Sequence, residues 1–155
     1  MKYLISIYKK INESIDSYDY HLTSDDAFLY KYEFEDAVGN KYLVEFKNIP
    51  ITKDRQLSHV YELLYYVKSE GQYSVSKIVN VNPYRILKTV FGDILKDFTK
   101  RCSWATNIFF VGLAKDRERE FVTSRTKIYK RYLDMNPPNG FSIKQAGNAI
   151  QLERK

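Results

Sequence analysis

Hydrophobic and polar residues alternate through the first half of the chain, which predicts β-strands. Residues 28–34 alternate cleanly, residues 36–40 supply a turn containing Gly39, and residues 42–46 return as a second strand. A second hairpin is predicted from residues 60–67 and 73–79. Residues 57–67 also fit a helical period, so a helix there is the alternative.

The period changes to that of a helix after Asn82 and Pro83, which together form a helix-start signal. Apolar residues then recur four apart in two adjacent rows, which predicts a broad buried face packed on a sheet. The two rows are Ile86, Val90, Ile94, Phe98 and Leu87, Phe91, Leu95. Gly92 interrupts the helix, and close approach of the helix to the sheet is the expected reason.

Residues 108–111 are apolar on both faces, which predicts a central strand. A helix over about residues 120–134 follows, and Pro137 and Pro138 end it. This helix is predicted to bury Phe121, Val122, Ile128, Tyr129, Tyr132 and Leu133. A last hairpin of residues 141–144 and 149–152, turning at Gly147, closes the predicted sheet.

The N-terminal segment reads as a short amphipathic helix over residues 2–15, because Leu4, Tyr8, Ile11 and Ile15 recur at helical spacing. A strand through residues 4–8 is the alternative. The helix either docks on the body or stands apart as a leader. The whole chain, residues 1–155, is expected to form a single domain by length.

The formal net charge is +6, and it is unevenly distributed. Residues 81–155 carry 15 Lys and Arg against 7 Asp and Glu, a net of +8, which favours an anionic partner such as nucleic acid. The single Cys102 excludes an internal disulfide and any cysteine-based zinc site. No run approaches 18 consecutive apolar residues, so no membrane span is expected.

The predicted order of elements, a meander, helix, strand, helix and hairpin, resembles that of the GNAT (N-acetyltransferase) fold. Residues 124–129, which end in Ile128 and Tyr129, and the later Gly140 and Phe141 are similar to the Asn-x-x-Ala-x-x-Leu-Tyr…Gly-Phe signature of that family. The resemblance implies an acyltransferase that uses acetyl-CoA, with Tyr129 as general acid. Tyr132 is the nearby alternative.

That family holds the coenzyme A diphosphate on a loop with the pattern Arg/Gln-x-x-Gly-x-Gly/Ala. On this pattern the chain keeps Arg85 but has Lys88 and Val90 where the small residues belong. These side chains obstruct approach of backbone N–H groups to the phosphates. Either Arg85 and Lys88 bind the cofactor through their side chains, or the cofactor site has been lost.

A second resemblance is to small proteins encoded by tailed phages. Its elements are a Thr-Val-x-x-Ile-Leu-type helix at residues 89–95, an Ile-x-Phe strand at 108–110 and a Ser-Arg-x-Lys-Leu/Ile-Tyr helix at 124–129. Residues 11–13, Ile-Asn-Glu, also resemble the cut site of phage head-maturation proteases. This implies a leader that ends at Glu13, although an ordinary terminal helix explains the same residues.

Basic residues gather around the second predicted helix, beside Tyr and Phe rings. A patch of this composition binds phosphates by charge and bases by stacking, although a solvated helix face is the simpler interpretation. The candidate nucleic-acid or partner-binding residues are Arg117, Arg119, Arg125, Lys127, Lys130 and Arg131.

The sequence gives little support to a two-histidine phosphoesterase or to a metal site. His21 and Thr23 match one His-x-Thr motif of a two-histidine phosphoesterase, but His59 does not supply the second. Two histidines and one cysteine lack the spacing of metal ligands, so no metal is expected.

The sequence therefore predicts a single α+β domain with a mixed, mostly antiparallel sheet flanked by helices, in a GNAT-like order. The favoured function is that of a non-catalytic phage accessory or virion-associated protein that binds a protein or nucleic acid partner, in the host cytoplasm or the virion. This function needs no cofactor. A GNAT-type acyltransferase that uses acetyl-CoA is the first alternative, and a basic nucleic-acid-binding protein is the second.

Overall fold

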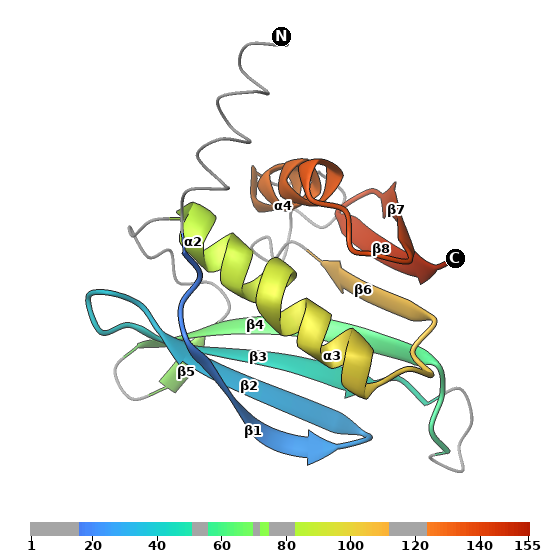
Figure 1. The fold of residues 1–155 in the computed structure, drawn as a ribbon, viewed down its shortest axis with the longest axis horizontal. Helices are drawn as coiled ribbons and strands as arrows, with labels where there is room; N and C mark the ends of the chain where they lie inside the picture. The colour runs from blue at the N-terminus through green and yellow to red at the C-terminus, as the bar shows by residue number, and fades with distance from the viewer. Residues whose placement is uncertain (1–15, 51–55, 70–71, 75–82, 112–123) are drawn as a thin grey trace, which may run out of the picture.

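A long helical run lies across one face of a twisted sheet in the computed structural model of the chain (Figure 1). The structure describes residues 16–50, 56–69, 72–74, 83–111 and 124–155. The predicted helix at residues 2–15 and its proposed cut site lie outside these residues. So do Phe121, Val122 and most of the predicted strand at 73–79.

Within the described residues the sheet has eight strands, and seven of them form a continuous order of β1-β2-β3-β4-β6-β8-β7. The strands are β1 (Tyr20–Asp26), β2 (Leu29–Glu35), β3 (Lys41–Asn48), β4 (Val60–Ser69), β5 (Gln72–Ser74), β6 (Asn107–Val111), β7 (Phe141–Ala146) and β8 (Ala149–Arg154). The short β5 pairs with β4. The described strands pair antiparallel with one exception, β4 with β6. The predicted α+β class and mostly antiparallel sheet are therefore confirmed.

The helical run comprises α2 (Pro83–Leu87), a π-helical segment η1 (Lys88–Ile94) and α3 (Leu95–Arg101). It starts at Pro83 as predicted, because proline has the fixed φ and the missing N–H that suit a first helical position. The predicted apolar rows are buried, with Ile86 only partly so. The change to π geometry at Lys88 was not predicted.

The second helix, α4 (Ser124–Met135), packs on the same face of the sheet as η1. Phe91 of η1 lies with its ring centroid 5.2 Å from that of Tyr129 and 6.4 Å from that of Tyr132, both on α4. Thr126 at the start of α4 donates a hydrogen bond to the side chain of Asn148 in the turn between β7 and β8. This bond fixes α4 to the closing hairpin.

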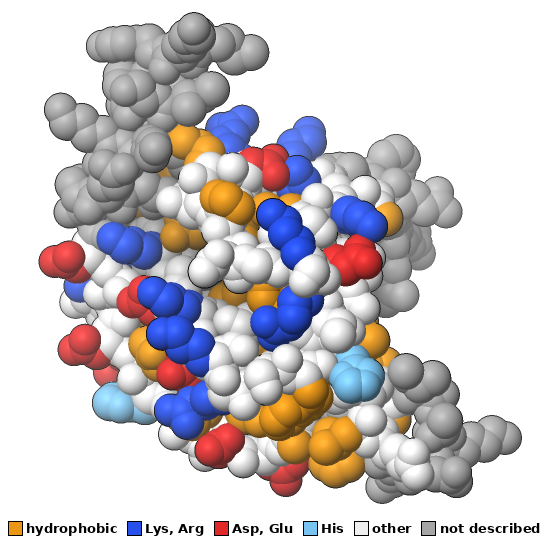
Figure 2. Space-filling model, turned by 45° about the vertical axis from the view of Figure 1, so that its right-hand side comes forward, with side chains coloured by type: hydrophobic (Ala, Val, Ile, Leu, Met, Phe, Trp, Pro, Cys, Tyr) orange, Lys and Arg blue, Asp and Glu red, His pale blue; other side chains and the backbone are white. Residues whose placement is uncertain are grey.

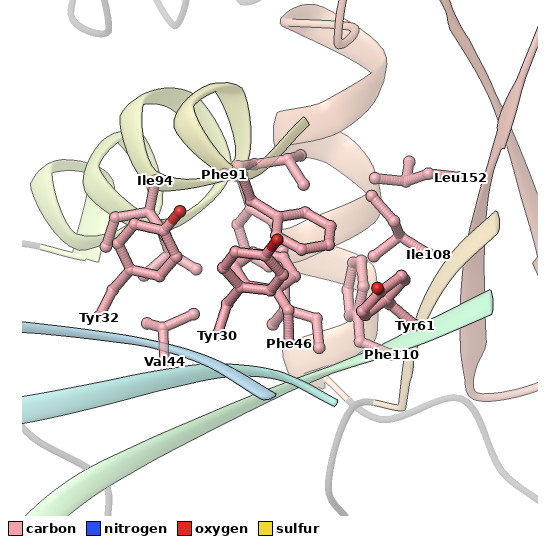
Figure 3. Packing of buried hydrophobic residues seen from close by; sticks show 14 of the residues in the cluster. Tyr30, Tyr32, Val44, Phe46, Tyr61, Phe91, Ile94, Ile108, Phe110 and Leu152 are labelled. Atoms are coloured by element: carbon pink, nitrogen blue, oxygen red, sulfur yellow. The ribbon is translucent and has the colours of Figure 1, made fainter. Parts of the chain in front are cut away.

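Aromatic rings fill the space between the helical run and strands β2 to β4 (Figure 3). Phe98 stacks on Phe46 with ring centroids 3.9 Å apart and planes 4° apart. Tyr30 and Tyr61 meet the Phe98 ring edge-on at 5.2 and 5.1 Å. The two edge-on contacts are of the kind that aromatic quadrupoles favour, and among the described tyrosines six are buried in the core.

The structure decides between the strand and the helix predicted for residues 57–67, adds one strand, and corrects the predicted packing of Ile128 and Gly92. Residues 57–67 form a strand and not a helix over most of their length, and residues 20–26 form an edge strand that was not delimited in advance. Ile128, predicted to be buried, is 43% exposed, because the side of α4 that meets the sheet carries Leu133 instead. Gly92 faces Tyr132 of α4 and not the sheet, so helix–helix contact explains it.

Candidate functional site

The neighbouring strands β4 and β6 pair over only three residues each. Residues 60–62 of β4 pair with residues 107–109 of β6. Beyond this point β4 continues to Ser69 and β6 continues to Val111. The described pairing of the two strands therefore ends while each remains a strand, and we call the place where it ends the β4–β6 opening.

Beyond the point where they stop pairing with each other, β4 and β6 each remain paired with other strands. Tyr61 to Val67 of β4 pair with β3, and Val67 to Ser69 pair with β5. Phe110 and Val111 of β6 pair with β8. The described strand pairing on this side of β4 therefore covers residues 60–62, through β6, and residues 67–69, through β5.

An unpaired strand edge presents backbone N–H and C=O groups, because alternate residues direct these groups to opposite sides of the strand. Such groups need a partner, since an unpaired backbone donor or acceptor away from water costs free energy. An extended ligand that carries amides meets this need by adding to the edge as a strand does.

Aromatic side chains surround the helix side of the opening. Phe110, the first β6 residue past the paired region, lies 4.9 Å from Phe91 of η1 and 6.0 Å from Tyr129 of α4, measured between ring centroids. Leu63, the first unpaired β4 residue, is buried on the same face. Apolar side chains therefore lie beside the backbone of β4 and β6 at the opening.

Tyr132 is the more deeply buried of the two predicted tyrosines. Its side chain is 3% exposed, and its hydroxyl would lie 3.4 Å from a Cβ atom built on Gly92. Burial, reinforced by the negative charge of Asp93, raises the pKa of Tyr132 to about 12. No hydrogen bond joins this hydroxyl to another described residue. The phenol therefore keeps its proton at neutral pH.

Tyr129, the predicted general acid, lies one turn earlier on α4 and is half-buried. Its ring packs against Phe91 and Phe110 at the opening itself. The structure thus brings both candidate tyrosines to the same region, with Tyr129 at the opening and Tyr132 deeper between the helices.

Arg85, a predicted cofactor ligand, lies over the ring of Tyr18, with its Cζ 4.0 Å from the ring centroid. Thr89 connects the same two residues. Its hydroxyl donates to the carbonyl oxygen of Arg85 at 2.7 Å and accepts from the backbone N–H of Tyr18 at 2.8 Å. Lys88 lies beside Gly92, at the α4 side of the helical run.

The basic residues predicted on the second helix divide into different environments. Lys127 and Arg131 are exposed, whereas Lys130 donates to both carboxylate oxygens of Asp134 at 2.7 Å. Arg125 belongs to α4, and Arg117 and Arg119 lie outside the described residues. The structure therefore places Lys127 and Arg131 on one exposed surface of α4.

The histidines and the cysteine take structural positions. His59 Nδ1 lies 2.8 Å from the carbonyl oxygen of Trp104, and His21 lies across from Glu33 on the edge strand. Burial raises the pKa of the Cys102 thiol. Over the described parts of the chain, no three His, Cys, Asp or Glu side chains are grouped as metal ligands would be.

Comparison of the chain with models of protein families, with curated proteins and with solved structures finds no match. Among the helices that the structure describes, none is long and apolar enough to cross a membrane.

Two parts of this site could not be found by sequence reasoning. Phe91 reads as an ordinary core residue of an amphipathic helix, and the place where β4 leaves β6 depends on a pairing register between distant strands. Leu63 and Leu64 carry no sequence signal for an unpaired edge, because their apolar character fits any interior strand.

Proposed function

We propose that the chain binds an acyl thioester in the opening between β4 and β6 and transfers the acyl group, as an N-acetyltransferase of GNAT-like architecture does. The observation that carries the proposal is the end of β4–β6 pairing after Glu62 and Phe109, while both strands continue. The order of elements supports it, since a helical run joins the two parallel strands and α4 joins β6 to the closing hairpin.

The donor's pantetheine arm is extended and contains two amides, which suits addition along β4 beyond its described pairing with β6. When bound, acetyl-CoA supplies the activated acyl group. The described edge and its apolar wall of Leu63, Phe91 and Phe110 fit such an arm, because they combine backbone hydrogen-bonding groups with a surface that excludes water.

Transfer moves the acyl carbon from the donor sulfur to an acceptor amine, which loses a proton while the sulfur gains one. A tyrosine that stays protonated at neutral pH is a suitable source of the second proton. Tyr129, whose ring contacts Phe110 beside the opening, is the candidate for this role, and Tyr132, whose raised pKa of about 12 makes it the weaker acid, is the alternative.

Recognition of the diphosphate end of coenzyme A by Arg85 and Lys88 stays a prediction. The position of Arg85 over Tyr18 gives its guanidinium a packing role as well. Arg85→Ala should therefore weaken both donor binding and the attachment of residues 17–18 to the helical run.

The test is a thermal melt and a thiol-release assay with acetyl-CoA. We expect millimolar acetyl-CoA to raise the Tm by mass action. We also expect Tyr129→Phe, and to a smaller extent Tyr132→Phe, to reduce thiol release while the folded fraction is unchanged. Tyr30→Phe is the matched control, because Tyr30 is an equally buried core tyrosine on β2. No change in Tm at millimolar acetyl-CoA contradicts the proposal.

A second candidate function is the one favoured by the sequence, a non-catalytic accessory protein of a tailed phage that binds a partner. The exposed Ile128 beside the exposed Arg131 favours it, since arginine is enriched and apolar side chains form the core of protein interfaces. A pull-down from infected host cells tests it. We expect a retained partner that Ile128→Asp releases, and retention that is insensitive to Ile128→Asp contradicts this surface.

A further inference from the structure

The two helical elements on one face of the sheet carry most of the positive charge of the described chain. The run from α2 to α3 has five basic and two acidic residues, a net of +3, and α4 has four basic and one acidic, also +3. Strands β1 to β4 together have four basic and six acidic residues, a net of −2. The domain is therefore electrically polarised, with its helical face positive.

Many cations of the protein are neutralised locally. Lys31, Arg101, Lys130 and Lys144 each lie within 4.0 Å of a carboxylate. The acidic residues of the helical face have internal partners too. Asp97 accepts from Tyr32 and Arg101, Asp134 accepts from Lys130, and Asp93 accepts from the hydroxyl of Ser17.

Four exposed cations on this face are different. Lys96 and Lys100 of α3 and Lys127 and Arg131 of α4 are exposed, and within the described residues none of them forms an ion pair. Figure 2 shows Lys and Arg side chains distributed across the face that these helices form. We name these four residues the basic face.

The basic face is built as two rows. Each row places its two charges four residues apart on a helix, which is a rise of about 6 Å. The helices that carry the rows contact each other where Gly92 of η1 faces the Tyr132 hydroxyl of α4. Regularly repeated positive charge suits a ligand with regularly repeated negative charge, such as the phosphates of a nucleic-acid strand, which recur about every 3.4 Å along a duplex axis.

We propose that the basic face is a contact surface for the phosphate backbone of nucleic acid. This adds Lys96 and Lys100 of α3 to Lys127 and Arg131 of α4, and Lys130 is excluded because Asp134 neutralises it. The contact is independent of sequence, since phosphate contacts position a protein without reading bases. It is also independent of acyl transfer, because none of the four residues lines the β4–β6 opening.

The test measures fluorescence anisotropy of labelled single-stranded and duplex oligonucleotides of about 20 nucleotides over a range of salt concentrations. We expect binding whose logarithm falls with the logarithm of salt concentration at a slope of about −3, as for roughly four phosphate contacts. The two probes distinguish single strands from duplex as the preferred source of phosphate.

Charge reversals locate the contact. The double variants Lys96→Glu with Lys100→Glu, and Lys127→Glu with Arg131→Glu, should each weaken binding about tenfold or more at low salt. The matched control is Lys41→Glu with Lys47→Glu, which changes the net charge equally but lies on the exposed side of β3. This control should change the affinity by less than about threefold.

Three results would overturn the proposal. They are absence of binding at low salt, an equal loss in the β3 control, and competition by polyglutamate that matches the oligonucleotide at equal charge. The last result would assign the basic face to an acidic protein instead. Failure of acetyl-CoA binding leaves these outcomes unchanged, so the two proposals fail separately.

Discussion

The hydroxyl of Tyr132 lies opposite Gly92, where a Cβ atom would be 3.4 Å from it. The missing side chain lets α4 approach η1 closely enough to bury Tyr132 almost completely. Gly92 belongs to the π-helical segment, and segments of this kind are frequent at functional sites. The pair connects the helix that faces the β4–β6 opening with the helix that carries both candidate tyrosines.

Gly92→Ala should leave the fold intact and raise the free energy of unfolding by about 0.5–1 kcal/mol, because alanine has the better helix propensity. The added Cβ meets the Tyr132 hydroxyl at the edge of ordinary contact. Urea unfolding monitored by circular dichroism measures this change. Gly92→Leu should instead destabilise by about 1–3 kcal/mol, since a long side chain displaces Tyr132. Equal effects of the two variants would contradict the close contact.

Asp97 of α3 accepts one hydrogen bond from Tyr32 of β2 and one from Arg101 on its own helix, which predicts different costs for Tyr32→Phe and Asp97→Ala. The hydroxyl of Tyr32 donates to Oδ2 at 2.8 Å, and Nε of Arg101 donates to the same oxygen at 2.7 Å. Tyr32→Phe removes one hydrogen bond and should cost about 1 kcal/mol. Asp97→Ala leaves the buried hydroxyl without this acceptor and should cost about 1–3 kcal/mol. Chemical denaturation tests the order, and a smaller cost for Asp97→Ala would reverse the interpretation.

Asp36 organises the turn between β2 and β3. Burial opposes its ionisation, but hydrogen bonds from the Tyr42 hydroxyl, from the Asn40 side chain and from backbone N–H groups lower its pKa below the ordinary 3.8. A lowered folded-state pKa stabilises the fold above 3.8, and the contribution is lost as the pH falls through the folded-state value.

Asp36→Asn should therefore destabilise by about 1–2 kcal/mol at pH 7, because Asn offers one acceptor oxygen in place of two. The difference from the wild type should shrink in acid, below the ordinary pKa. Urea titrations at neutral pH and at about pH 3 compare the two proteins. A difference that is independent of pH would show that the carboxylate charge is not responsible.

Phe98 is the centre of the aromatic core and provides the strongest stability prediction. It is fully buried and stacks on Phe46. Phe98→Ala should lower the free energy of unfolding by about 3–5 kcal/mol, through lost burial and a residual cavity. Ile128→Ala is the comparison on the exposed side of α4, and it should stay within about 0.5 kcal/mol. A large loss at Ile128 would contradict its observed exposure.

Local signals in the sequence predicted the individual elements well. Gly39 in its positive-φ turn, Pro83 at the helix start and Gly147 in the last hairpin all appear where their backbone preferences place them. Periodicity also identified the buried side of the helical run, because residues four apart share one face.

Relationships between distant residues could not be predicted in the same way. The end of β4–β6 pairing after Glu62 depends on the register between two strands that are distant in the sequence. The position of Gly92 against Tyr132 depends on how two helices pack. Ile128 shows the limit within one element, since an apolar residue on a helix need not face the core. The arrangement of the candidate site depends on such relationships, so it could be described only from the structure.

The most direct test of acyl-donor binding is an NMR titration of the ¹⁵N-labelled protein with acetyl-CoA, followed at the backbone amides. We predict that shifts concentrate at residues 63–66 of β4 and at Phe110 and Val111 of β6, with amides of the edge strand β1 unchanged. We also predict that hydrogen exchange slows along β4 beyond Glu62, as expected when a bound ligand protects backbone amides. Unchanged amides at residues 63–66 at millimolar acetyl-CoA, or shifts confined to other strands, would contradict the account.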